Sequence, residues 1–194
     1  SLSDSVRVLF DRYRLEDIAV KVVGIGSVGM RCLVGLFSSA EGDPLLLQFK
    51  EVCPSVLAPY AGDSVYPNQG QRVVTGQRLM QSSSDIFLGW TRGRKGHHFF
   101  GRQLRDMKFS FPIELAPPKG LRLYAEVCGW TLARAHAKSG DAATISGYLG
   151  RSDAFDQAIG RFALAYADQN GRAHAALAAA ARAGRIEALV EEDL

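Results

Sequence analysis

The chain has 194 residues, of which 47% are apolar and 22% charged, enough for a real core in one domain or two small lobes. The formal net charge of +3 is small, which argues against a dedicated nucleic-acid-binding protein with a clustered basic face. The longest apolar runs fall far short of the roughly 20 residues that span a bilayer, so no membrane association is expected.

The cysteines and histidines argue against a metal site. Cys32, Cys53 and Cys128 form no C-x-x-C motif, and each has apolar neighbours, so we expect buried, reduced thiols in a cytoplasmic protein. His97 and His98 are adjacent and would point to opposite sides of a strand. No signal peptide is visible, and the chain starts at Ser1 without an initiator Met, so we expect it to be part of a longer protein.

The first half of the chain is predicted to contain short strands with two helices. Apolar residues recur at helical spacing in 4–16, with Asp4 as a possible N-cap, and a second helix is predicted over 70–81. Residues 53–70 are predicted to form a loop, and turns are expected at 41–44 and 92–98. Strands are expected at 18–23, 30–37, 45–52, 84–91 and 98–104.

The second half is predicted to be almost wholly helical. Prolines at 112, 117 and 118 indicate a linker. Helices are expected at 119–138, 152–169 and 173–190, the second of them starting near Asp153 and Asp156. We therefore predict an α+β protein with an antiparallel-sheet lobe at 1–110, carrying a glycine-rich hairpin, and a helical lobe at 111–194.

The stretch VVGIGSVGMRCLVGLF contains GIGSVG, which fits G-x-G-x-x-G. In a dinucleotide-binding Rossmann unit the third glycine opens a helix. The residues from Met30 to Phe37 lack helical periodicity and soon reach a Gly-Asp-Pro turn, so a strand is favoured. The glycines are therefore predicted to lie in the bend of a β-hairpin.

A glycine-rich hairpin followed by an apolar strand that carries a lysine is the arrangement of protein kinases. In that arrangement the backbone N–H groups of the loop cover the nucleotide phosphates, and the strand lysine pairs with them. Lys50, at the end of LLLQFK, would be this lysine. The simpler alternative is a glycine-rich hairpin that happens to lie beside a surface lysine.

Two positions depart from the kinase pattern. Arg31 replaces the valine that would cover the adenine, and the helix predicted at 70–81 has glutamines but no glutamate to pair with Lys50. Glu51 is near in sequence, but alternation should direct its side chain to the opposite face of the strand.

The chain lacks the H-R-D and D-F-G motifs of kinases. Residues 62–68 have the G-D-x-x-x-x-N spacing of small-molecule kinases, but a turn Asp63 and a helix-capping Asn68 are the favoured interpretation. Residues 135–141 are interpreted as a helix C-terminus with His136 near the end and Gly140 as the cap.

Segments from about Asp17 to Gln169 resemble an uncharacterised bacterial family of kinase-like proteins that is defined only as a domain of unknown function. The segments are VVGIGSVGMRC, LLLQFKEV, RVVTGQRLMQSSSDIFLGW, FFGRQLRDMK, LARAHAKSGDA, ISGYLG and FDQAIGRFALAYADQ. Members of the family are similar to aminoglycoside and choline kinases, with the elements permuted. Their G-D-x-H-x-x-N-F and D-F-D-E segments precede the glycine loop, so this chain resembles the C-terminal portion of such a protein.

The resemblance implies an ATP-binding role that depends on an upstream segment of the same protein for catalytic and magnesium-binding residues. Arg105 would adjoin the hinge strand at the adenine. The nucleotide-binding residues would be Gly24, Ile25, Gly26, Ser27, Val28, Gly29, Lys50, Gln103 and Leu104.

The function implied is that of a phosphotransferase using ATP and magnesium on an unknown acceptor. Whether the protein is an active enzyme stays open. A non-catalytic, pseudokinase-type interaction module is the main alternative, and a Rossmann oxidoreductase is a third, which requires a helix at 29–40.

Overall fold

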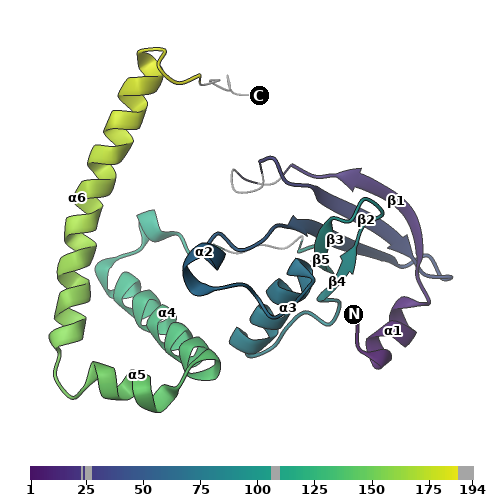
Figure 1. Ribbon diagram of the computed structural model, residues 1–194, viewed down its shortest axis with the longest axis horizontal. Helices are drawn as coiled ribbons and strands as arrows, with labels where there is room; N and C mark the ends of the chain where they lie inside the picture. Colours follow the sequence, from purple (N-terminus) through teal and green to yellow (C-terminus); the bar gives the residue numbers. More distant parts are fainter. Residues whose placement is uncertain (23, 25–27, 106–109, 188–194) are drawn as a thin grey trace. The chain divides into compact units, whose positions relative to one another are not determined.

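The computed structural model describes residues 1–22, 24, 28–105 and 110–187 (Figure 1). The chain divides into two compact units, Ser1–Asp141 and Ala142–Leu194. All the strands described belong to the first unit, and the elements described in the second are helices. The predicted α+β class is confirmed at this level, whereas the lobe boundary at 110 stays a prediction.

The first unit is built on a five-stranded antiparallel sheet in the order β1-β2-β3-β5-β4. The first three strands lie side by side in sequence order, whereas β5 inserts between β3 and β4. The strands are β1 (Arg14–Val20), β2 (Cys32–Ser38), β3 (Pro44–Val52), β4 (Gly89–Arg92) and β5 (His98–Gln103).

The glycine-rich stretch joins β1 to β2 as a hairpin connection, as predicted. β1 and β2 pair antiparallel up to Val20 and Leu33, and the N–H of Lys21 donates to the carbonyl of Cys32. No residue from 28 to 40 is helical. The helix that a Rossmann pyrophosphate site requires after the third glycine is therefore missing from these residues.

One face of the sheet packs against α1 (Asp4–Phe10) around an aromatic core. The rings of Phe10 and Phe37 lie 5.2 Å apart, and Phe87 adds a third ring. Predicting a single helix over 4–16 was wrong, because residues 14–20 pair with β2 as a strand. Long-range pairing overrides the local helical spacing there.

The other helix of the sheet lobe is α3 (Gln69–Met80), which confirms the helix predicted at 70–81. The Asn68 side chain accepts hydrogen bonds from the N–H groups of Gly70 and Gln71, so its predicted capping role is confirmed. Val74, a residue of α3, is fully buried. The preceding segment, predicted as loop, includes the short α2 (Ala58–Ala61).

The strand predicted at 84–91 is present only from Gly89, as β4. The prediction was wrong for residues 84–88, because the Asp85 carboxylate accepts the N–H of Phe87 and closes a turn there. The turn predicted at 92–98 is confirmed by a hydrogen bond from the N–H of Gly93 to the carbonyl of His97.

A 3₁₀ turn, η2 (Ile113–Leu115), precedes α4 (Pro118–Ser139), which packs against α3 within the first unit. The predicted C-cap is confirmed, because the N–H of Gly140 donates to the carbonyl of His136. Lys138 reaches across to donate to the carbonyl of Gln81, 2.6 Å away. α4 is thereby tied to the end of α3.

The second unit contains α5 (Ala142–Leu149) and α6 (Ala154–Arg182). The predicted pair of helices at 152–169 and 173–190 was wrong, because a single helix runs through Asn170 and Gly171 and ends at Arg182. One glycine costs a helix only about 1 kcal/mol, which its long alanine-rich surroundings offset. Within the described residues, no helix is both long and apolar enough to cross a membrane.

The three cysteines are free thiols, but they are not all buried as predicted. Cys32 is buried in β2 and Cys128 is half-buried, whereas Cys53 is exposed. Cys53 lies just beyond the last residue of β3. Apolar sequence neighbours alone did not determine its burial.

Candidate functional site

The glycine segment between β1 and β2 provides the first part of the candidate site. Gly24 and Gly29 have φ angles of +37° and +79°, conformations that favour glycine over any residue with a Cβ. Val28 is exposed. The remaining predicted residues of the segment, Ile25, Gly26 and Ser27, lie outside the described part of the chain.

Lys50 of β3 lies beside the base of this segment. It pairs across the sheet with Cys32, the first residue of β2, and on the other side with Phe100 of β5. Directly opposed residues in antiparallel strands place their side chains on the same face, so Lys50 and Cys32 share a face. Among the described residues, no hydrogen bond or ion pair involves the ammonium group of Lys50, whose backbone belongs to the ladders with β2 and β5.

The same face continues along β3 to Gln48, which is opposed by Arg102 of β5. Gln48 is buried and its amide donates to the Cys32 thiol sulfur at 3.5 Å. Arg102 lines a cavity together with Gln77 of α3 and with Gln81, the residue that follows α3, so α3 covers this face. Lys50 and Arg102 therefore provide two positive charges on the face that carries α3.

This cavity, of about 740 Å³, lies between the end of α3, residues 83–86 and the end of β5. Gln103 and Leu104, predicted to meet the adenine, both line it, as does Arg105. The N–H of Gln103 donates to the Asp85 carboxylate, and that of Leu104 donates to the carbonyl of Leu46. Both N–H groups are engaged, so a base bound here would have to use other groups of the strand end.

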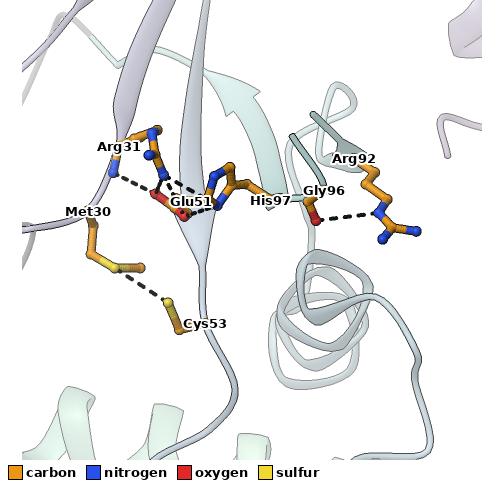
Figure 2. A network of polar contacts seen from close by, with 7 residues as sticks. All are labelled: Met30, Arg31, Glu51, Cys53, Arg92, Gly96 and His97. Carbon is orange, nitrogen blue, oxygen red and sulfur yellow. Dashed lines mark hydrogen bonds and ion pairs between the residues drawn. The ribbon is translucent and has the colours of Figure 1, made fainter. Parts of the chain in front are cut away.

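A cluster of charged residues that the sequence did not predict lies at the opposite end of β3 (Figure 2). Glu51 accepts hydrogen bonds from the backbone N–H and the guanidinium of Arg31, at 3.0 Å each, and its other oxygen lies 2.8 Å from Nδ1 of His97. The Glu51 side chain is only 8% exposed. Arg31 and Glu51 are 20 positions apart along the chain, and Glu51 and His97 are 46 apart, so no local pattern could reveal the cluster.

The protein environment lowers the pKa of Glu51 from its ordinary value of 4.5. Burial by itself raises this pKa, but the hydrogen bonds from Arg31 and the positive charges of Arg31 and His97 together outweigh the burial. Glu51 is thereby held as a carboxylate.

The cluster also shows where two side chains of the predicted site point. Glu51 is opposed by Phe99, whereas Lys50 is opposed by Phe100, so the two side chains lie on opposite faces as predicted. The guanidinium of Arg31 is bonded to the Glu51 carboxylate, and it is therefore turned away from the face of Lys50. Arg31 consequently does not cover the face of Lys50, where the kinase pattern would place a valine.

The acidic residues that the structure describes do not gather into a metal site. In the described part of the chain, no three His, Cys, Asp or Glu side chains are placed to hold a metal ion. The described residues therefore do not fit a magnesium centre, although the glycine amides and Lys50 are groups that suit an anionic phosphate chain.

The fold and the candidate site define a mixed α+β protein, with a glycine-rich hairpin and a strand lysine on one face of a five-stranded antiparallel sheet. The chain belongs to a family described as an uncharacterised protein conserved in bacteria (DUF2252), whose model matches residues 1–180. No curated protein and no solved structure matches the chain.

Proposed function

We propose that this chain is the ATP-binding portion of a kinase-like phosphotransferase. The observation that carries the proposal is the register of β2 and β3, which pairs Lys50 with Cys32 directly after the glycine segment. A mobile ammonium group next to backbone amides is the combination by which kinases hold nucleotide phosphates.

The order of the elements supports the same proposal. A glycine hairpin between the first two strands, a lysine on the third and a packed helix between the third and fourth occur here in that order. In protein kinases that helix supplies a glutamate to the lysine. α3 contains no Asp or Glu, and the cavity is lined instead by Gln77 of α3 and by Gln81 just after it.

Phosphoryl transfer also requires carboxylates that bind magnesium and orient the acceptor. The described residues offer no such cluster, so we propose that another segment of the protein supplies it. Cytoplasmic location and an acceptor substrate remain parts of the same proposal. Residues 1–194 alone are expected to bind ATP weakly and to turn none over.

The main alternative is a non-catalytic, pseudokinase-type interaction module. It is favoured by one observation, the lack of an acidic residue on α3 that could hold Lys50 in place. Both functions begin with nucleotide binding, and they differ in whether phosphoryl transfer appears when the complete protein is supplied with ATP and magnesium.

Binding of ATP, measured by titration calorimetry with and without magnesium, tests the proposal. Lys50→Ala should weaken binding by roughly tenfold or more, because a hydrogen bond to a charged group contributes about 1.5–3 kcal/mol. Lys95→Ala is the matched control, since it removes the same charge from an exposed position in the turn between β4 and β5. Equal affinity of Lys50→Ala and the unaltered protein would exclude the assignment, provided that circular dichroism shows both to be folded.

A further inference from the structure

The Glu51 cluster fastens the C-terminal end of the glycine segment to the sheet. The N–H of Arg31 donates to the Glu51 carboxylate, and the carbonyl of Arg31 accepts the N–H of Glu51 at 2.8 Å. The guanidinium of Arg31 adds bonds to both carboxylate oxygens, at 3.1 and 3.0 Å. Arg31, at the end of the segment, is therefore bound to Glu51 of β3 through both its backbone and its side chain.

The cluster joins three parts of the first unit (Figure 2). His97, in the turn between β4 and β5, contacts Glu51, and its Nδ1 also lies 3.3 Å from the Arg31 guanidinium. Cys53, beyond the end of β3, donates to the sulfur of Met30 at 3.6 Å. Both Met30 and Arg31 thus have partners that do not belong to the hairpin itself.

We propose that Glu51 is a positioning residue that fixes the exit of the glycine segment, residues 28–31, for binding a nucleotide polyphosphate chain. The inference rests on the proposed nucleotide-binding function and deepens it. Glu51 lies on the face opposite Lys50, so its side chain would not contact a bound phosphate. It would act only by holding the backbone of Arg31, which ends the glycine segment.

Preorganisation is the physical reason for this role. A segment whose end is held before binding loses less conformational freedom when its amides close on a ligand. Backbone amides of this segment would meet phosphate oxygens rather than the base. Loss of the Glu51 contacts should therefore weaken ATP while leaving adenosine nearly unaffected.

Two variants separate the Glu51 contacts from general stability. Glu51→Gln keeps the size of the side chain but loses the charge, and Arg31→Ala removes a largely exposed guanidinium. Arg94→Ala, at an exposed position of the turn between β4 and β5, is the control for Arg31→Ala. The unaltered protein and all three variants are titrated with ATP and with adenosine, and amide hydrogen exchange is measured without nucleotide.

In Glu51→Gln and Arg31→Ala we expect the ATP dissociation constant to rise roughly threefold to tenfold and that for adenosine to stay within about twofold. In Glu51→Gln the amide of Arg31 should exchange about tenfold faster, because its acceptor is weakened. The Arg94→Ala control should match the unaltered protein. Equal weakening of ATP and adenosine, or unchanged exchange at Arg31, would overturn the positioning role.

The two readouts separate this inference from the proposed function. If the unaltered protein binds no ATP, the proposed function fails, and the phosphate role of Glu51 fails with it. Faster exchange in Glu51→Gln would then still establish the link between Glu51 and Arg31. If ATP binds and both variants match the unaltered protein, only the inference about Glu51 is lost.

Discussion

Glu51 shows how much the surroundings of a single residue determine its chemistry. Its neighbour Lys50 differs by one position along β3, and this places the two side chains on opposite faces of the sheet. One face presents a lysine that the described residues leave without an ion-pair partner. The other holds a carboxylate that contacts the guanidinium of Arg31 and the imidazole of His97.

Acid should release the Glu51 cluster. The pKa of Glu51 is lower in the folded protein than its ordinary value of 4.5, so the stabilisation is present above about pH 4.5 and is lost as pH falls through the folded pKa. The ionisable groups facing Glu51 are Arg31 and His97, whereas the guanidinium of Arg92 is turned to the carbonyl of Gly96.

Thermal unfolding of the unaltered protein and of Glu51→Gln, at pH values from about 3 to about 8, measures this effect. Above about pH 5 we expect Glu51→Gln to be less stable by about 1–3 kcal/mol, because charge-assisted hydrogen bonds are lost. The difference should shrink in acid as Glu51 becomes protonated. A difference that is independent of pH would show that the charge of Glu51 contributes nothing.

At the scale of elements, the approach of α3 to the sheet depends on a glycine. A Cβ on Gly70 would overlap the carbonyl of Phe99 in β5, whereas a Cβ on Gly76, further along the same helix, meets nothing within 4 Å. The helix can therefore lie against β5 only where residue 70 has no side chain. The same glycine-to-alanine change should have opposite effects at the two positions.

Gly70→Ala should destabilise the protein by about 1–3 kcal/mol, because α3 or β5 must shift to relieve the overlap. Gly76→Ala should stabilise it by about 0.5–1 kcal/mol, because alanine has the higher helix propensity. Urea unfolding followed by circular dichroism provides both values. Equal effects at residues 70 and 76 would contradict the close packing of α3 on β5.

At the scale of the whole molecule, the predicted site residues that the structure describes all belong to the first unit. The glycine segment, Lys50 and the end of β5 lie between residues 20 and 105, and α4 packs on α3 up to Ser139. Residues 142–187 contribute none of the contacts described for the candidate site.

A chain shortened to residues 1–141 should therefore retain the ATP affinity of the 194-residue chain within about twofold. Calorimetry on both chains, with circular dichroism as a check on folding, measures this. A folded shortened chain that binds ATP much more weakly would show that the second unit takes part in the site.

Periodicity and turn residues were enough to predict β2, β3, β5, α3 and α4. Each is a short apolar run, or a helix with a clear cap, between strong turn signals. Two of the errors share one cause. Residues 14–16 and 84–88 have local patterns that other parts of the chain override, through pairing with β2 in the first case and the Asp85 turn in the second.

The candidate site likewise has parts that the sequence predicted and parts that it did not. The sequence by itself determined the glycine hairpin, the strand with Lys50 and the opposite orientation of Glu51, because alternation along a strand is a local property. Only the tertiary structure decided that Lys50 lies beside Cys32, that residues 103 and 104 line a cavity with α3, and that Arg31, Glu51 and His97 meet. These contacts depend on strand register and helix packing, which bring together residues that no local pattern connects.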